Sequence, residues 1–312
     1  MAALMAALAI RRAGLLTTVQ DLGRPGRGRF GVSPSGAMDP VALRIANRMV
    51  GNPDGAPALE LTAVGPEIEF LAPTRFALAG GDLSPSLDGV PLELWRAYAA
   101  RAGAVLTFGR RRQGGRCYLA VVGGVAVPQV LGAAATDLEA GLGGVSGGAL
   151  RAGQRLAAGG VGDRPSRDAL PSILRAYDPP FELRFVAEAG GPVAESAVRA
   201  FSAARYRVGP RSNRMGYRLE GPVLSGGGGA MLSEPVPPGA IQLPPDGQPI
   251  MLMADRPTVG GYPRLGALIA ADQPKAGQLL PGHEVRFRPV TLAEAHAALL
   301  ELEGWVEQAV PR

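Results

Sequence analysis

The sequence predicts a mostly β protein with a few helices, and three observations point to this fold class. The chain contains 45 glycines and 29 prolines, which indicate frequent turns. Hydrophobic residues make up 46% of it, which is more than a disordered chain carries. The apolar residues fall in short runs bounded by Gly and Pro, which is typical of strands joined by turns. The length of 312 residues is sufficient for two domains, each with its own core.

Charge and cysteine content exclude several classes of protein. The net charge is +5, but apart from Lys275 the basic residues are arginines scattered along the chain, so we expect no nucleic-acid partner. Cys117 is the only cysteine and lies in an apolar run, which predicts a buried core thiol. The apolar residues 1–10 are too few to span a membrane and have no basic segment before them, so we predict a cytoplasmic protein without membrane association.

Residues 14–40 form the first notable segment, which we predict to be a long shaped loop. Glycines and prolines are too frequent there for a helix or a central strand. Val19, Leu22 and Phe30 offer apolar anchors that argue against disorder. Because long ordered loops in compact domains are usually functional, we predict that this loop forms part of a site.

A helix over residues 40–50 follows the loop. Asp39 suits the N-cap, Pro40 suits the first helical position, and Gly51 suits the end. One apolar stripe faces the core and comprises Val41, Ile45 and Met49.

Strands dominate the rest of the first half. Alternation around a Gly-Pro turn predicts a hairpin over residues 59–72, and Asp88-Gly89 predicts a second hairpin within 83–94. Further strands are expected at residues 76–79, 104–108 and 116–122. The Gly-rich residues 132–149 form either a second loop facing the same site or a surface excursion, and the sequence favours neither.

A linker rich in Gly, Pro and charge at residues 159–180 separates the two halves, so we predict domains at 1–170 and 171–312. The second domain opens with a strand at 181–187 and a helix at about 193–204. It closes with a helix from Thr291, where Thr291 and Glu294 form a capping box. The inward face of that last helix comprises Ala295, Leu299, Leu302 and Val306.

Most common catalytic devices do not fit this sequence. The two histidines are isolated, no zinc-binding pattern occurs, and Lys275 lacks the P-loop context. What remains are polar residues in three Gly-rich loops, at 14–40, 206–222 and 253–266. Arginine forks bind carboxylate or phosphoryl groups, and aspartates hold magnesium or take a proton. The alternative is that each Asp–Arg pair merely closes a surface turn.

We predict that the three loops share one site without a protein-held metal. The candidate catalytic residues are Asp21, Arg24, Arg214 and Asp255. The candidate substrate-binding residues are Ser35, Met38, Asn213, Tyr217, Arg256, Thr258, Gly260, Gly261 and Tyr262.

Four of these segments also carry a family resemblance. They read GLLTTVQDLGRPG, SPSGAMDPVALRIANRMVGN, SNRMGYRLEG and PPGAIQLPPDGQPIMLMADRPTVGGYPRLG. Together they resemble the family that comprises the C subunit of 5-oxoprolinase, the Kip antagonist protein and the carboxyltransferase region of urea carboxylase, also described as allophanate hydrolase subunit 2-like. The likeness runs from about Leu15 to Phe287. One departure is Pro257, where the family's loop usually has a glutamine.

The resemblance implies a fold, partners and an activity. The fold would be two cyclophilin-like β-barrel domains in tandem. The partners would be the B subunit (Kip inhibitor-like) and the A subunit (lactam-utilisation-like) of 5-oxoprolinase, with a small anionic substrate. The implied activity is the ATP-dependent opening of 5-oxoproline to L-glutamate, with ATP and Mg²⁺ used at the level of the complex.

Two other functions remain open. As a carboxyltransferase, the chain would use carboxybiotin on urea or a related amide, with biotin arriving on another protein because no Met-Lys-Met attachment signature is present. As a regulator, it would antagonise a kinase inhibitor without catalysis.

Overall fold

The computed structural model describes residues 6–159, 167–169, 177, 179–191, 193–226 and 231–310. The chain divides into two compact units, each of them discontinuous in sequence. Unit 1 comprises Met1–Arg24, Ser35–Tyr177 and Trp305–Arg312, and unit 2 comprises Pro25–Pro34 and Asp178–Gly304. The predicted domain boundary at residue 170 lies outside the described residues.

Unit 1 is built from two antiparallel sheets. The seven-stranded sheet has the order β11-β12-β1-β4-β9-β6-β7, and the five-stranded sheet has the order β2-β3-β10-β5-β8. Their bounds are β1 Ala6–Arg12, β2 Leu16–Gln20, β3 Ala58–Thr62, β4 Glu67–Phe70, β5 Thr74–Gly80, β6 Pro85–Leu87, β7 Val90–Pro91, β8 Arg96–Ala100, β9 Val105–Phe108, β10 Arg116–Val121, β11 Val125–Ala126 and β12 Arg155–Ala158. Phe70 of one sheet stacks on Phe76 of the other with ring centroids 4.9 Å apart, so the core lies between the sheets.

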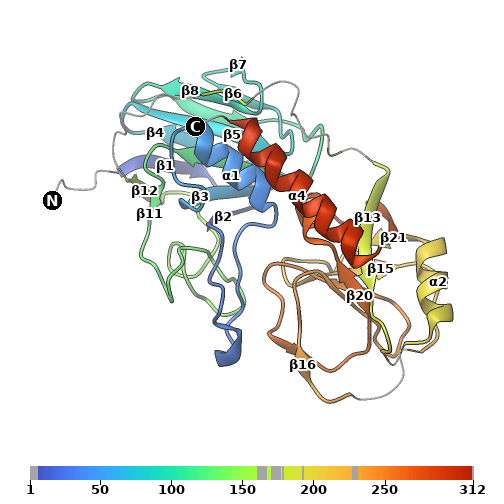
Figure 1. Ribbon diagram of the computed structural model, residues 1–312. Helices are drawn as coiled ribbons and strands as arrows, with labels where there is room; N and C mark the ends of the chain where they lie inside the picture. The colour runs from blue at the N-terminus through green and yellow to red at the C-terminus, as the bar shows by residue number, and fades with distance from the viewer. Residues whose placement is uncertain are drawn as a thin grey trace. The chain divides into compact units, whose positions relative to one another are not determined.

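Helix α1 (Pro40–Met49) packs on the five-stranded sheet, against β5 and β10 (Figure 1). The predicted start is confirmed, because Asp39 accepts a hydrogen bond from the Ala42 amide at 2.9 Å and Pro40 occupies the first turn. The predicted stripe of Val41, Ile45 and Met49 is buried. Local capping chemistry therefore fixes the position at which the loop before α1 ends.

Asp39 offers a stability test in unit 1. Its carboxylate is fully buried and accepts a second hydrogen bond from the Tyr177 hydroxyl at 2.8 Å. We expect Asp39→Ala to lower the free energy of unfolding by about 2 kcal/mol, because a cap and a buried hydrogen bond are lost together. Urea unfolding followed by tryptophan fluorescence measures this in unit 1, since Trp95 and Trp305 both belong to it. Asp39→Asn, which still caps, should lose less; an equal loss would contradict the capping role.

Unit 2 contains a closed seven-stranded barrel with the order β13-β20-β17-β18-β15-β14-β21. Among these pairs only β13 and β21 run parallel. The barrel strands are β13 Phe181–Ala187, β14 Arg205–Val208, β15 Gly216–Glu220, β17 Ala240–Gln242, β18 Ile250–Leu252, β20 Arg264–Leu268 and β21 Glu284–Pro289. A separate two-stranded ribbon joins β16 (Glu234–Pro235) to β19 (Val259–Gly260).

Helices complete unit 2. Helix α2 (Glu195–Ala203) packs against β21 on the outside of the barrel (Figure 1). Its Phe201 stacks on Phe287 at 4.5 Å and meets Phe185 edge-on at 5.4 Å. The short α3 (Gln273–Ala276) follows β20, and α4 (Leu292–Ala309) begins at the predicted capping box, where the Thr291 amide donates to Glu294 at 2.7 Å. An aromatic cluster thus joins α2 to the barrel wall.

The structure confirms the mostly β class and corrects two local predictions. The hairpin over residues 59–72 is wrong: β3 pairs with β2 and β10, whereas β4 pairs with β1 and β9. The turn between β3 and β4 leads the chain from one sheet into the other, with the backbone of Gly65 close against the Phe108 ring. The hairpin at Asp88-Gly89 is confirmed, with both residues at positive φ as that turn type requires.

The second correction concerns residues 14–40, predicted as loop throughout. Residues 16–20 form β2, an edge strand, so the loop proper runs from Asp21 to Asp39. Val19 is buried as predicted, but Leu22 and Phe30 are 45% and 62% exposed and do not anchor the loop. The Arg29 guanidinium instead covers the Phe30 ring at 4.7 Å from its centroid.

Two further expectations concern Cys117 and the membrane. Cys117 is buried in β10, and burial raises the pKa of its thiol, as suits a core residue. No helix in the described part of the chain has the length and apolarity that a membrane crossing needs.

Candidate functional site

In unit 1, Asp21 ties the start of the long loop to the Gly-rich segment around residue 134. Its carboxylate accepts hydrogen bonds from the amides of Gly23 at 2.7 Å and Ala134 at 2.6 Å. The side chain is buried, so both bonds form in a setting of low dielectric constant, where they are strong. Asp21 therefore fixes the backbone that positions Arg24.

Arg24 is the most unusual cation in unit 1. It is 1% exposed, donates through Nη2 to the Ala135 carbonyl and through Nε to the Val130 carbonyl at 3.4 Å. Its Nη1 has no hydrogen-bond partner among the described residues, and no described carboxylate forms an ion pair with it. Burying a cation without a counter-charge is costly, so this guanidinium is suited to an anion.

Gly143 lets the Gly-rich segment approach Arg24. A Cβ at this position would lie 2.9 Å from Arg24 Nη2 and 2.0 Å from the Ala135 carbonyl oxygen, and its φ is +70°. Ser35, at φ +54°, donates from its hydroxyl to the Thr136 carbonyl at 2.9 Å. Of the two alternatives for residues 132–149, the structure supports a loop that adjoins the Asp21–Arg24 segment.

Met38 lies deeper in unit 1. Its side chain is buried and its amide donates to the Glu60 carboxylate at 2.9 Å. The same carboxylate accepts from the Tyr118 hydroxyl at 2.7 Å, and burial raises the pKa of Tyr118 well above its ordinary value. The contacts of Met38 thus belong to the core.

In unit 2, Arg214 and Asp255 form a bidentate ion pair. Arg214 Nε and Nη2 donate to the two carboxylate oxygens at 2.8 and 3.0 Å, and both side chains are buried. The Asp255 amide also donates to the Arg214 carbonyl at 2.9 Å. This pair joins the loop at residues 213–215 to the loop at 253–258.

Arg256, the next residue, has a different environment. Its Nε donates to the Val236 carbonyl at 3.2 Å, and no described carboxylate forms an ion pair with it. Burial lowers the pKa of its guanidinium, which nevertheless stays protonated at neutral pH. Arg256 is therefore a partly buried cation without a counter-charge among the described residues.

Three other candidates make structural contacts. Asn213 accepts from the amides of Met215 and Gly216 and so closes a turn. Tyr217 is buried in β15 and donates to the Leu279 carbonyl at 3.3 Å. Thr258 is half-buried, and its carbonyl accepts from the Val236 amide at 3.1 Å, beside β16.

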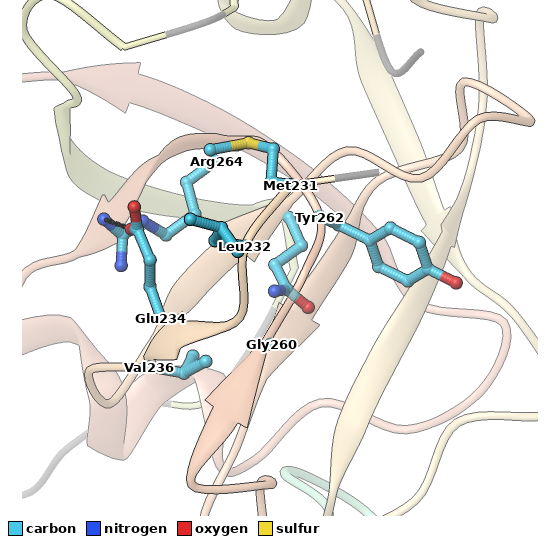
Figure 2. A pocket seen from close by; sticks show the side chains of 8 residues that line it. Met231, Leu232, Glu234, Val236, Gly260, Tyr262 and Arg264 are labelled. Carbon is cyan, nitrogen blue, oxygen red and sulfur yellow. Dashed lines mark hydrogen bonds and ion pairs between the residues drawn. The ribbon is translucent and has the colours of Figure 1, made fainter. Parts of the chain in front are cut away.

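Gly260 and Tyr262 line a small hollow of about 10 Å³, which opens to solvent beside the β16–β19 ribbon. Figure 2 shows Glu234 and Arg264 together on one side, joined by an ion pair of 3.2 Å, with Tyr262 projecting on the other. Met231 and Leu232 lie between them (Figure 2). Arg264 is further bonded to Glu188 at 2.8 Å, so its charge is balanced. Gly261 adjoins Gly260 but is not part of the lining.

The sequence analysis missed six of the eight lining residues, of which three are polar: Glu234, Gln242 and Arg264. No sequence signal pointed to Gln242, because a single glutamine at the end of an apolar strand such as β17 is common. The predicted site residues are divided between the two units. Unit 1 contains Asp21, Arg24, Ser35 and Met38, and unit 2 contains the others.

Within the described ranges, no three or more His, Cys, Asp or Glu side chains are grouped so that they could hold a metal ion.

Comparisons with known proteins agree with the resemblance noted in the sequence. The chain is 38% identical to the C subunit of 5-oxoprolinase from Escherichia coli (strain K12) over 96% of this chain and 97% of that protein. The protein of the same name from Haemophilus influenzae is 36% identical over 93% and 94%. The crystal structure of the K. lactis urea amidolyase superposes with a TM-score of 0.90 at 28% identity, covering 97% of this chain and 20% of that one.

A family model described as "Carboxyltransferase domain, subdomain A and B" matches residues 30–289. The match includes Arg214, Asp255 and the whole lining of the hollow, and the two bacterial relatives extend the similarity to nearly the full chain. The chain therefore belongs to the carboxyltransferase domain, subdomain A and B family.

Proposed function

We propose that this chain is the C subunit of an ATP-dependent 5-oxoprolinase, which opens 5-oxoproline to L-glutamate together with its A and B subunits. The observation that carries the proposal is the similarity to two proteins named as the C subunit of 5-oxoprolinase, at 38% and 36% identity along nearly the whole of each. The name implies further subunits, and we expect activity only in their presence.

The reaction explains why ATP would be needed. The ring amide of 5-oxoproline is a poor electrophile, and phosphorylation of its oxygen by ATP would activate the carbon for attack by water. The ring C–N bond then breaks as the nitrogen takes up a proton, which leaves an acyl phosphate. A second water hydrolyses this acyl phosphate and releases phosphate and L-glutamate. The carboxylates of Asp21 and Asp255 are already engaged by the Ala134 amide and by Arg214. We therefore assign ATP and Mg²⁺ to the complex.

The contacts narrow the choice of anion-binding residues. The guanidinium of Arg214 is engaged by Asp255, whereas Arg24 and Arg256 have no carboxylate partner among the described residues. We propose Arg256 as the group that binds the substrate carboxylate. Arg214 and Asp255 would serve by holding the loop that carries Arg256.

Arg256 gives the proposal a direct test. In the complex with the A and B subunits, we expect Arg256→Met to raise the KM for 5-oxoproline by about 10- to 100-fold, the loss of one charge-assisted contact of about 1.5–3 kcal/mol. Arg256→Lys should be intermediate because it keeps the charge but not the planar fork. The assay is 5-oxoproline-dependent ATP hydrolysis. Arg211→Met, at an exposed arginine of unit 2, is the control and should match the wild type. An unchanged KM for Arg256→Met would remove this residue from the substrate site.

A carboxyltransferase function is the second candidate, favoured by the family description and by the similarity to urea amidolyase. It would transfer a carboxyl group from carboxybiotin on another protein to urea or a related amide. Incubation with the A and B subunits, ATP and 5-oxoproline, in parallel with a carboxybiotin carrier and urea, separates the two. ADP formation with only the first substrate supports the hydrolase, and biotin-dependent urea carboxylation supports the transferase.

The proposal also covers the type of barrel that each unit forms. We infer that the barrel of unit 2 is of the cyclophilin-like type and that the two-sheet unit 1 is a more open version of it. We further propose that the protein works in the cytoplasm.

A further inference from the structure

The segment Pro25–Pro34 of unit 2 forms an arm whose tip carries two arginines and an aromatic ring. Residues 25–31 are all exposed, and Phe30 keeps 62% of its surface in solvent. Arg27 and Arg29 form no ion pair with any described carboxylate, and the arm itself contains no acidic residue. The tip therefore presents unbalanced positive charge together with an exposed apolar ring.

The tip is held in one conformation although these side chains are not buried. The amides of Phe30 and Gly31 donate to the carbonyls two positions before the turn closes, those of Arg27 and Gly28, at 2.9 Å each. These bonds form a turn of 3-10 helix, and the Arg29 guanidinium lies 4.7 Å from the centroid of the Phe30 ring. An element that is already ordered loses little conformational entropy on binding, so this tip is suited to contact a partner.

The arm lies against the loop that carries Arg256. Ser33 Oγ donates to the Ala254 carbonyl at 3.4 Å. Nearer the tip, a Cβ on Gly28 would lie 4.0 Å from the Thr258 methyl carbon. A molecule bound to the tip would therefore adjoin the loop that we propose to bind the substrate.

Exposed apolar side chains also occur on the β16–β19 ribbon and in the residues next to it. They are Leu232, Val259 and Tyr262, with 91%, 51% and 45% of their surface exposed. Large apolar side chains that are grouped on a surface mark sites for protein partners. Arginine and aromatic residues are the types that are enriched at such sites and contribute most of the binding energy.

We propose that the arm docks into an acidic groove on another subunit of the complex, with an apolar pocket that receives Phe30. Carboxylates on that subunit would complement the unbalanced charge of Arg27 and Arg29. This inference rests on the proposed function and deepens it, because a subunit bound at the arm would lie beside the loop that carries Arg256. The need for partner subunits would then have a physical cause at this loop.

Three other occupants fit the arm less well. A second copy of this chain is disfavoured because the net charge of +5 makes two copies repel each other. A nucleic acid is bound by a longer basic stripe than two arginines supply. An anionic membrane is bound by clusters of about four to eight basic residues.

The first test measures binding of the full chain to the purified A and B subunits, each alone and both together, by isothermal titration calorimetry. We expect Phe30→Ala to raise the Kd about 10- to 100-fold, as for the loss of a central aromatic anchor. Arg29→Glu should raise the Kd by a similar factor in about 50 mM salt and by less in about 300 mM, because salt screens exposed charges. Leu300→Ala and Arg211→Glu are the matched controls at exposed positions of unit 2 and should keep the wild-type Kd.

A second test separates docking from catalysis. In the assay of 5-oxoproline-dependent ATP hydrolysis, Phe30→Ala should raise the concentration of partner subunit needed for half-maximal activity about 10- to 100-fold. The maximal rate and the KM for 5-oxoproline should stay at the wild-type values, in contrast to Arg256→Met. Thermal unfolding should also be unchanged, because the side chains at the tip are exposed.

The outcomes distinguish the docking surface from the proposed function. Equal Kd values for the wild type, Phe30→Ala and Arg29→Glu in an active complex would overturn the docking surface alone. A complex that depends on the arm but lacks 5-oxoproline-dependent ATP hydrolysis would overturn the proposed function alone. Dimerisation of the chain by itself that Phe30→Ala abolishes, or binding of duplex DNA or anionic vesicles that Arg29→Glu abolishes, would overturn the assignment to a partner subunit. No binding to the A and B subunits together would overturn both proposals.

Discussion

Replacing Asp255 by alanine is expected to lower the free energy of unfolding of unit 2 by about 3–5 kcal/mol, because it leaves the buried guanidinium of Arg214 without its counter-charge. Urea unfolding followed by far-ultraviolet circular dichroism measures the loss. Tryptophan fluorescence follows unit 1 in the same experiment, because Trp95 belongs to that unit.

Two controls separate the burial of this pair from its charge alone. The double variant Arg214→Met with Asp255→Leu should recover most of the stability, because an apolar pair of similar volume replaces a buried ion pair at little cost. Glu195→Ala, which removes the exposed pair with Arg199 on α2, should change stability by less than about 0.5 kcal/mol. A loss below about 1 kcal/mol in Asp255→Ala would mean that the pair is not the buried link between the two loops. A stable but inactive double variant would instead assign these residues a role in chemistry.

Phe201→Ala is expected to have an effect of similar size, about 3–5 kcal/mol, through a different mechanism. Phe201 is fully buried in α2 and contacts Phe185, Tyr206 and Phe287 through ring centroids 4.5 to 5.4 Å apart. Removing the ring leaves a cavity among these aromatic side chains and detaches α2 from the barrel wall. Circular dichroism in urea again follows unit 2.

The neighbouring Tyr206 supplies an informative comparison. Its hydroxyl is buried without a partner among the described residues, and burial raises the pKa of Tyr206 to about 12. Tyr206→Phe should therefore leave stability unchanged or increase it, because an unpaired hydroxyl is removed and the ring is kept. Leu300→Ala, on the exposed face of α4, should change little. A large loss in Leu300→Ala, or none in Phe201→Ala, would contradict the described core of unit 2.

The sequence predicted features whose causes are local. The Asp39 cap, the box formed by Thr291 and Glu294 and the turn at Asp88-Gly89 depend on residues within three positions of each other, and the structure contains all three. The pairing of β3 and β4 was predicted wrongly because it depends on distant partners. The residues between β3 and β4 indicate a turn, but they do not determine which sheet the chain enters after it.

In the candidate site, too, residue types could be predicted locally, whereas their partners could not. Loop composition led to Arg24, Arg214 and Asp255, but a residue type does not reveal whether a charge is already balanced. Arg214 and Asp255 are 41 positions apart and pair with each other, whereas Arg256 beside them has no described acid partner. Gln242 was overlooked because an isolated glutamine in a strand is common.

The discontinuity of the two units has a consequence for biosynthesis. Trp305 and Val306 belong to unit 1, where the Val306 carbonyl accepts from Arg48 at 2.9 Å, but both are translated after all the residues of unit 2. A nascent chain emerging from the ribosome thus contains a complete unit 2 while unit 1 still lacks its final segment. Maturation of the N-terminal unit is expected to finish last, in reverse of the usual vectorial order.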